Sequence, residues 1–143
     1  MKKVRIFTDG CCKGNPGPGG YGCIIQYQDT VKELTGAERQ TTNNIMEMKA
    51  AIVALKSLNE PCEVELTTDS RYLIQGITEW IPGWIKNNWI NSSRKPVKNQ
   101  SLWKELLVLS QKHKISWHWI KGHSGHPENE RCDFLANKAL TSL

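Results

Sequence analysis

The chain has 143 residues, of which 38% are hydrophobic and 23% charged, and its formal net charge is +5. This length suits one domain able to bury a core, here expected to span residues 1–143, and the composition argues against a disordered tail or a fibre. No apolar run approaches the roughly 18 residues that a membrane helix needs, and the first residues lack the features of a secretory signal, so we expect no membrane partner.

Three strands are expected at the start of the chain. Residues 3–9 alternate between polar and apolar side chains and predict a strand that ends at Asp9. The glycines and prolines of residues 11–20 predict a turn, and residues 21–28 and 31–36 predict two further strands. Because the connections are short, the three strands should form an antiparallel meander.

The middle of the chain alternates between helix and strand. Apolar side chains recur at helical spacing over residues 43–58. Three residues could cap this helix: Thr42, Asn43 or Asn44. Residues 63–68 predict a strand that ends at Asp69. A further helix should start at Ser70, and Pro82 should interrupt it.

The last part of the chain continues this alternation. Residues 83–89 could hold a short helix and residues 91–96 a polar loop, followed by a helix over 100–112. A strand is expected over 115–120, and Pro127 suits the first position of a final helix. Strands that alternate with helices after an antiparallel meander predict an α/β fold, with a mixed sheet covered by helices.

The five cysteines are widely spaced. An odd number is a poor disulfide framework, and no C-x-x-C pair is present to bind zinc. We interpret them as reduced thiols, mostly core fillers, in a cytoplasmic protein.

Two aspartates stand at the predicted ends of strands. If the strands before Asp9 and Asp69 are parallel neighbours, both carboxylates emerge at one edge of the sheet, where α/β proteins form their sites. The alternative is helix capping, which is a serious rival for Asp69 because a helix follows it.

Glu47 and Asp133 are carboxylates on apolar helix faces. Four apolar residues share the face of Glu47: Ala50, Ala51, Ala54 and Leu58. A carboxylate in such a place is costly unless it is paired or binds a cation, and Lys49 lies off that face. Asp133 repeats the pattern in the final helix, although either residue taken alone is more simply a boundary residue.

Several carboxylates that converge would repel one another and raise one another's pKa values. A divalent cation removes this conflict, and hard oxygen ligands select magnesium or manganese over zinc. Such a site suits in-line displacement at phosphorus, in which one ion activates the attacking water and another stabilises the leaving oxygen.

Residues 71–104 concentrate the basic charge. They hold six basic residues and one acid, and therefore the whole net charge, together with four of the six tryptophans. Basic charge interleaved with aromatic rings suits a polyanion with flat bases, nucleic acid foremost. A solvated face with tryptophans in the core is an equally good interpretation.

Five short motifs together resemble the type 1 ribonuclease H family in its bacterial form. They lie at residues 6–10, 12–17, 42–47, 68–70 and 121–133, and include Phe-Thr-Asp-Gly in the first and Gly-His-Ser-Gly-His-Pro-Glu-Asn in the last. Each motif is weak by itself, but their order and their spread over nearly the whole chain are specific.

This resemblance implies a five-stranded mixed sheet and hydrolysis of the RNA strand of RNA–DNA hybrids. The reaction would be endonucleolytic, would need Mg²⁺ with Mn²⁺ as a possible substitute, and would leave 5′-phosphate and 3′-hydroxyl ends. The matching positions make four residues the metal-binding catalytic carboxylates: Asp9, Glu47, Asp69 and Asp133. His123, in a glycine-flanked loop, resembles a histidine that assists proton movement or product release. We expect a monomer.

The resemblance also implies contacts to both strands of the hybrid. RNA differs from DNA by its 2′-hydroxyl, which is displayed in the minor groove. The matching minor-groove residues are Asn15, Asn43 and Asn44, with Cys12 and Gln75 as weaker candidates. On the DNA strand, Thr42 and Asn99 match a phosphate pocket and Trp80 an aromatic residue that packs on a deoxyribose. Helix capping is the alternative role for Asn43, Asn44 and Asn99, and the expected role of His126.

Three alternatives stand beside this interpretation. A non-catalytic hybrid-binding module would lack a carboxylate, and none is missing. A glycoside hydrolase would use two carboxylates and leave the others unexplained. An integrase or junction resolvase would share the metals but not need the asparagines. Residues 84–103 resemble a basic protrusion of the bacterial family but carry only four basic side chains: Lys86, Arg94, Lys95 and Lys98. We therefore also expect weaker and less salt-sensitive hybrid binding than a more basic protrusion would give.

Overall fold

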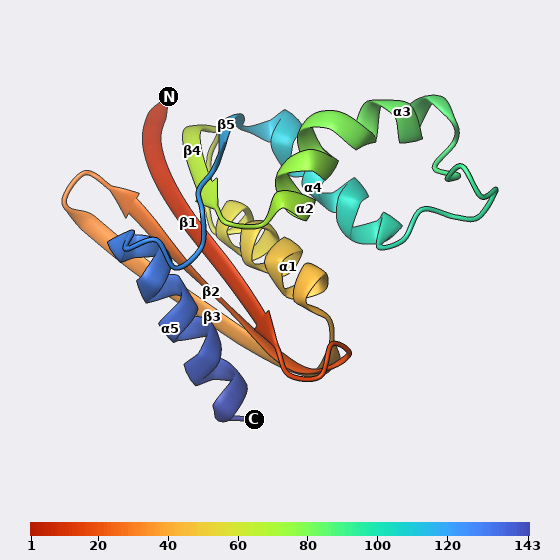
Figure 1. Cartoon of the computed structure of the whole chain (residues 1–143). Helices are drawn as coiled ribbons and strands as arrows, with labels where there is room; N and C mark the ends of the chain where they lie inside the picture. Colours follow the sequence, from red (N-terminus) through yellow and green to blue (C-terminus); the bar gives the residue numbers. More distant parts are fainter.

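A computed structural model describes residues 1–143 as a mixed five-stranded sheet with helices on both faces (Figure 1). Three strands form an antiparallel meander: β1 (Lys2–Cys12), β2 (Gly17–Tyr27) and β3 (Thr30–Thr41). Two more add in parallel, β4 (Cys62–Thr68) beside β1 and β5 (Lys114–Trp119) beside β4. The order across the sheet is β3-β2-β1-β4-β5, and the predicted mixed sheet is therefore confirmed.

The strands beside the glycine-rich segment are longer than predicted. β1 continues past Asp9, and β2 begins at Gly17, so the turn is confined to residues 13–16. A Cβ at Gly20 would lie 2.2 Å from the Ala136 carbonyl oxygen. Gly20 therefore lets the last helix pack closely on β2. From the sequence alone, a glycine needed for close packing looks the same as a glycine needed in a turn.

β3 is also longer than predicted and does not end at Gly36. It runs to Thr41, and the Tyr21 ring of β2 lies over the glycine, where a Cβ would be 2.2 Å from the Tyr21 hydroxyl oxygen. The glycine thus makes room for an aromatic ring within the sheet. β5 begins and ends one residue earlier than expected.

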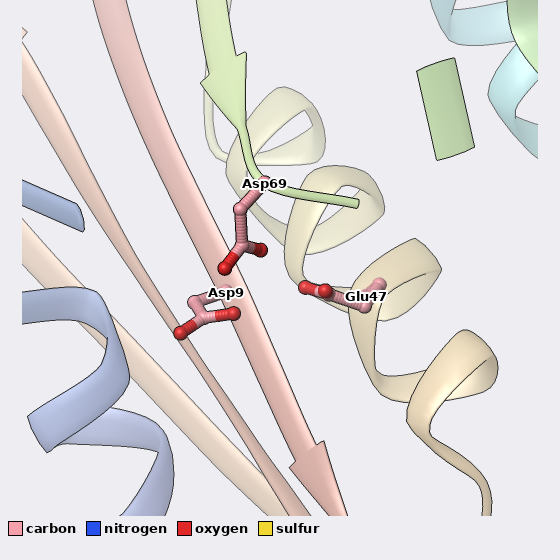
Figure 2. A group of neighbouring side chains, drawn as sticks. All are labelled: Asp9, Glu47 and Asp69. Atoms are coloured by element: carbon pink, nitrogen blue, oxygen red, sulfur yellow. The ribbon is translucent and has the colours of Figure 1, made fainter. Parts of the chain in front are cut away.

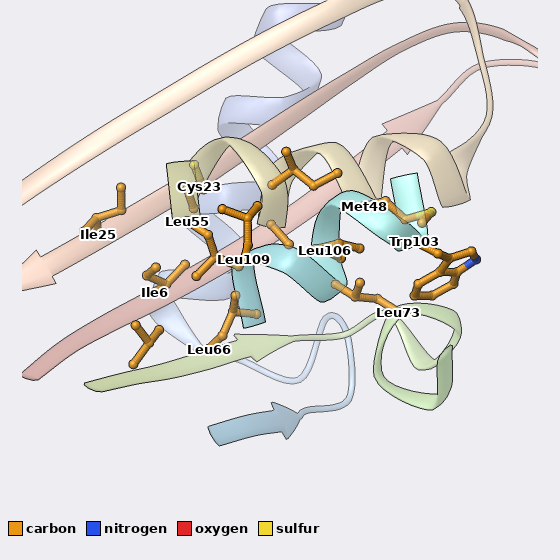
Figure 3. Packing of buried hydrophobic residues seen from close by; sticks show 14 of the residues in the cluster. Ile6, Cys23, Ile25, Met48, Leu55, Leu66, Leu73, Trp103, Leu106 and Leu109 are labelled. Carbon is orange, nitrogen blue, oxygen red and sulfur yellow. The ribbon is translucent and has the colours of Figure 1, made fainter. Parts of the chain in front are cut away.

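Helices α1 (Asn43–Lys56) and α4 (Gln100–Lys112) cover one face of the sheet, and α5 (Pro127–Thr141) packs on the other (Figure 1). Thr42 caps α1, because its hydroxyl oxygen accepts a hydrogen bond from the Ile45 N–H at 3.2 Å. The larger core lies between α1, α4 and the sheet (Figure 3). Its fully buried side chains include Leu66, Leu73, Trp103 and Leu106. The smaller core beneath α5 consists of Phe7, Ile24, Cys132 and Leu135.

The chain after β4 stays helical across Pro82, contrary to the predicted interruption. α2 (Arg71–Gln75), a π-helical turn η1 (Gly76–Trp80) and α3 (Ile81–Lys86) follow one another directly. The Ile81 N–H donates to the Gly76 carbonyl five residues back. Pro82 then falls in the first turn of α3, where a missing N–H costs little. The second helical piece accordingly covers 81–86 rather than 83–89.

All five cysteines are free thiols, and three of them, Cys23, Cys62 and Cys132, are buried in the core as expected. None of the helices combines the length and the apolar character that crossing a membrane demands. The parallel ladder between β1 and β4 ends at Thr8 and Thr68, and acidic side chains gather just beyond this point.

Candidate metal centre

Three carboxylates from three elements meet just beyond the β1–β4 ladder (Figure 2). The last residues paired in this parallel ladder are Thr8 and Thr68, so Asp9 and Asp69 come next on neighbouring strands. Glu47 approaches from α1, and one carboxylate oxygen of each residue lies within 4.8 Å of the others. The parallel pairing brings the two aspartates together as anticipated, but Asp9 does not end β1, which continues in its pairing with β2.

Glu47 owes its position to the close packing of α1 on β1. Three residues of its helix face are fully buried: Ala50, Ala51 and Ala54. Gly10 lies beneath the helix, since a Cβ there would be 2.6 Å from the Glu47 backbone nitrogen. Lys49 pairs with Glu38 and not with Glu47. The Oε1 atom of Glu47 is consequently buried without a hydrogen-bond partner.

Asp69 is free of the capping role that its position allowed. Ser70 caps α2 instead, and its hydroxyl oxygen accepts from the Leu73 N–H at 3.1 Å. The Trp119 indole N–H donates to the Asp69 backbone carbonyl at 2.9 Å. Neighbouring groups thus fix the backbone of Asp69 and leave its carboxylate available to the cluster.

Burial and mutual repulsion oppose ionisation of the clustered carboxylates. Burial, and then the charge of Asp69, raises the pKa of Asp9 to about 8. Burial, and then the charges of Asp9 and Asp69, raises the pKa of Glu47 well above its ordinary value. A hydrogen bond of 2.9 Å from the Gly10 N–H to Asp9 Oδ1 lowers the pKa of Asp9 only in part. The all-oxygen donor set and the unpaired oxygen of Glu47 fit a hard divalent cation, Mg²⁺ or Mn²⁺.

The cluster opens into a cavity of about 380 Å³. Asp133 lines this cavity from α5, and its Oδ1 accepts a hydrogen bond from the Asn137 amide at 3.2 Å. His123 lines it from the exposed loop between β5 and α5, with a left-handed backbone at φ +55°. Three of the proposed substrate contacts also line it: Cys12, Asn43 and Asn44.

Five further cavity residues were not predicted as site residues: Gly10, Cys11, Ser70, Arg71 and Tyr72. The signal that could have found them is their closeness in sequence to the two predicted aspartates. Gly10 and Cys11 directly follow Asp9 on the same strand, and the other three directly follow Asp69.

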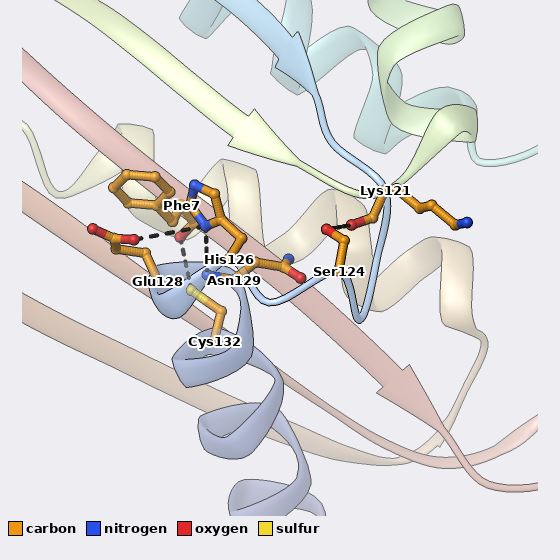
Figure 4. Close-up of polar contacts among 7 residues, drawn as sticks. All are labelled: Phe7, Lys121, Ser124, His126, Glu128, Asn129 and Cys132. Carbon is orange, nitrogen blue, oxygen red and sulfur yellow. Dashed lines mark hydrogen bonds and ion pairs between the residues drawn. The ribbon is translucent and has the colours of Figure 1, made fainter.

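The start of α5 is held by polar contacts (Figure 4). His126 caps α5 as expected, with its Nδ1 atom accepting from the Asn129 N–H at 3.2 Å. The Cys132 thiol donates to the Phe7 carbonyl on β1 at 3.3 Å. Because Cys132 precedes Asp133, this bond ties the fourth carboxylate to the strand that carries the first.

The other predicted substrate contacts lie outside this cavity. Asn15 Oδ1 accepts from the Asn43 N–H at 2.9 Å, and Gln75 is exposed at the end of α2. Asn99 makes no capping hydrogen bond, and its amide donates to the Tyr72 hydroxyl at 3.1 Å. Asn99 occupies the N-cap position of α4, but capping by its side chain is wrong. Capping is also wrong for the side chains of Asn43 and Asn44, since Thr42 caps α1.

The tryptophans of the basic segment divide between core and surface. Trp103 is fully buried, whereas Trp80 and Trp84 are half-buried and their ring centroids lie 5.9 Å apart. Together with Lys86, these two rings line a second cavity of about 780 Å³. Both interpretations of this segment, core packing and a surface of cations and rings, thus hold in part.

Comparison with known proteins agrees with this geometry. A family model described as RNase H matches residues 1–141. A protein named ribonuclease H from Geotalea uraniireducens is 63% identical over 138 residues, which cover 96% of this chain and 94% of that protein. One of the same name from Erythrobacter litoralis is 58% identical, with 97% and 96% covered. The crystal structure of LC9-RNase H1, a type 1 RNase H with the type 2 active-site motif, is similar with a TM-score of 0.90 and 31% identity, covering 99% of this chain and 74% of that one.

Proposed function

The chain belongs to the ribonuclease H family, and from this premise we propose that it is a divalent-metal-dependent endonuclease that hydrolyses the RNA strand of RNA–DNA hybrids. The observation that carries the proposal is the convergence of Asp9, Glu47 and Asp69 in an open cavity, with a buried oxygen of Glu47 left unpaired. Buried carboxylates without a cationic partner are costly, and this arrangement is expected where a protein holds a divalent cation.

In the proposed site, Asp9, Glu47 and Asp69 hold the cation, and Asp133 adds a fourth carboxylate from the cavity wall. We assign Mg²⁺ as the ion, with Mn²⁺ as a substitute. When bound, such ions supply the charge stabilisation for in-line displacement by water, which leaves 5′-phosphate and 3′-hydroxyl ends. His123 assists proton movement or product release, a role that its exposed place at the cavity suits.

Recognition of the RNA strand is assigned to the start of α1. The side chains of Asn43 and Asn44 are exposed beside Glu47 and are not used in capping, so their amides are available to a 2′-hydroxyl. Asn15 holds the backbone of Asn43 in place. We assign Cys12 and Gln75 weaker contacts in the same minor groove.

Recognition of the DNA strand is assigned to Thr42, Asn99 and Trp80. The Thr42 oxygen accepts the capping hydrogen bond, which leaves its hydroxyl proton to donate to a phosphate. Asn99 retains a second amide hydrogen beyond the one given to Tyr72. The half-exposed ring of Trp80 offers a surface for a deoxyribose. We propose that the enzyme forms one catalytic domain over residues 1–143 and acts as a monomer in the cytoplasm.

Cleavage of end-labelled duplexes tests this function. RNA–DNA hybrid, double-stranded RNA and double-stranded DNA would each be incubated with Mg²⁺, with Mn²⁺ and with a chelator. The expected result is cutting of the hybrid's RNA strand alone, with either metal, to give 5′-phosphate ends. Tight hybrid binding without cutting in either metal would contradict the proposal and favour a non-catalytic hybrid-binding module.

A further inference from the structure

Arg71 is the only lysine or arginine among the residues that line the carboxylate cavity. The residue is exposed, and its guanidinium forms no ion pair with any of the four carboxylates or with another acid. A cation that faces a cavity rich in carboxylates without pairing to one of them has its hydrogen-bond donors free for another anion. This anion must come from outside the chain.

The guanidinium is held in place by an aromatic ring. Arg71 Cζ lies 4.4 Å from the centroid of the Trp119 ring, within the range of a cation–π contact. Trp119 is the last residue of β5 and pairs with Thr68 of β4. Its indole N–H donates to the backbone carbonyl of Asp69 at 2.9 Å. The stacked pair is thereby fixed relative to one of the three clustered carboxylates.

The contact with Trp119 is not a hydrogen bond, so it leaves the N–H groups of the Arg71 guanidinium free. A planar guanidinium presents these donors in a fork that matches two oxygens of a phosphodiester. Four carboxylates in one cavity repel a polyanion, and a fixed cation at the cavity wall offsets part of this repulsion. A phosphodiester is therefore the anion that fits both the donors and the surroundings.

We propose that Arg71, supported by Trp119, binds a phosphate of the RNA strand close to the bond that is cut, and so helps to seat that strand over the carboxylates. The strand is assigned because Arg71 lies two residues after Asp69 and in the same cavity. This inference rests on the proposed function, since it presupposes that an RNA strand enters the cavity. It adds a charged contact to those proposed for the asparagines at the start of α1, which line the same cavity.

The test combines variants with hybrids in which one RNA phosphate at a time is replaced by an uncharged methylphosphonate. A 2′-deoxy residue keeps each such linkage stable, and the same deoxy substitution with a normal phosphate serves as reference. Single-turnover cleavage at every linkage is measured for the wild type, Arg71→Gln and Arg71→Lys. Arg5→Gln is the matched control. Arg5 is also exposed, forms no ion pair and lies over an aromatic ring, with its Cζ atom 5.2 Å from the Phe7 centroid, but it does not line the carboxylate cavity.

Arg71→Gln is expected to slow cleavage of the unmodified hybrid about tenfold, mainly through weaker binding, as for loss of one charge-assisted hydrogen bond. In the wild type, a methylphosphonate at one fixed distance from the cut should slow cleavage by a similar factor. In Arg71→Gln, that same replacement should cost nothing further. Arg71→Lys should lie between the two, and Arg5→Gln should match the wild type.

Two results would overturn the inference: an unchanged rate for Arg71→Gln, or the same loss at every methylphosphonate position in wild type and variant alike. The second result would mean that Arg71 acts through the general field and not through a contact. Failure of the wild type to cut the unmodified hybrid would instead overturn the proposed function. Thermal unfolding of Arg71→Gln should match that of the wild type, because the side chain is exposed.

Discussion

Replacing Asp9 by asparagine should stabilise the metal-free protein at neutral and alkaline pH while it removes a proposed metal ligand. Asp9 has an ordinary pKa of 3.8, and burial together with Asp69 raises it to about 8 in the folded chain. The folded state therefore disfavours the ionised form, and this source of instability is absent below about pH 4, grows as the pH rises and is complete above pH 8. At 1.36 kcal/mol for each pKa unit, its ceiling is about 6 kcal/mol.

The gain for Asp9→Asn should be smaller than this ceiling, because Glu47 and Asp69 share the repulsion and remain in place. We expect a gain of about 2–4 kcal/mol in the free energy of unfolding at pH 9, and a much smaller one at pH 5. The amide oxygen of the introduced asparagine can still accept the hydrogen bond that Gly10 donates to Asp9 Oδ1, so little is lost in exchange.

Urea unfolding in chelator at pH 5, 7 and 9 measures this difference for wild type and variant. Saturating Mg²⁺ should then stabilise the wild type and have little effect on the variant. If Asp9→Asn is less stable than the wild type at pH 9 in chelator, or if the difference does not change with pH, the electrostatic account of the cluster is wrong.

Three further expectations concern the loop, the buried histidine and salt. In Gly122→Ala the new Cβ would lie 2.5 Å from Asp69 Oδ2, so the affinity for Mn²⁺, measured by calorimetry, should fall about tenfold. Gly83→Ala is the control, because a Cβ at Gly83 meets open space, and it should bind Mn²⁺ as the wild type does. Equal Mn²⁺ affinities for Gly122→Ala and the wild type would refute the steric argument. His113 Nδ1 accepts a hydrogen bond from the Cys62 N–H, and burial lowers the pKa of His113, so its contribution to stability is present above its unfolded-state pKa near 6.5 and is lost as the pH falls. His113→Ala should therefore lower the free energy of unfolding in urea by about 1–3 kcal/mol at pH 7 and by less at pH 5. A larger loss at pH 5 than at pH 7 would contradict this expectation. The logarithm of hybrid affinity should fall with the logarithm of salt concentration with a slope shallower than about −6, and a steeper slope would show more phosphate contacts than the thinly charged protrusion suggests.

The sequence pattern was sufficient for the elements that depend on local periodicity and on parallel pairing. The helix of Glu47 and the strand before Asp69 follow from apolar spacing, and the mixed sheet follows from the chain connections, whereas the order of the strands came from the structure. Once β1 and β4 are parallel neighbours, Asp9 and Asp69 have to lie side by side. The apolar face behind Glu47 supplied the third member of the cluster.

The errors arise where one residue type has more than one structural use. Gly20 and Gly36 were expected near a turn and at a strand end, but they make room for α5 and for the Tyr21 ring. Pro82 was expected to break a helix, but the π-helical turn before it brings it into a first helical turn. Such uses depend on packing between distant segments, which no local pattern contains.

The residues proposed to contact the substrate were the hardest part of the site to predict from the sequence. Arg71 stood out only as one of the six basic residues of 71–104 and by its nearness to Asp69, because its proposed role rests on a contact with Trp119, which is far away in the chain. The roles of Asn99 and Ser70 likewise depended on which side chain actually caps each helix. Competing caps differ by about a kilocalorie per mole, which a sequence pattern does not resolve.

Glu47→Gln tests whether the buried carboxylate cluster binds the metal used in RNA cleavage. Glutamine keeps the shape of the side chain and removes the charge that burial and Asp9 and Asp69 disfavour. The measurement is the single-turnover rate of RNA-strand cleavage in Mg²⁺, alongside urea unfolding in chelator. We predict a variant at least as stable as the wild type whose cleavage is slower by on the order of a hundredfold or more. A Glu47→Gln variant that cuts the hybrid at the wild-type rate would show that the cluster does not bind the metal used in cleavage.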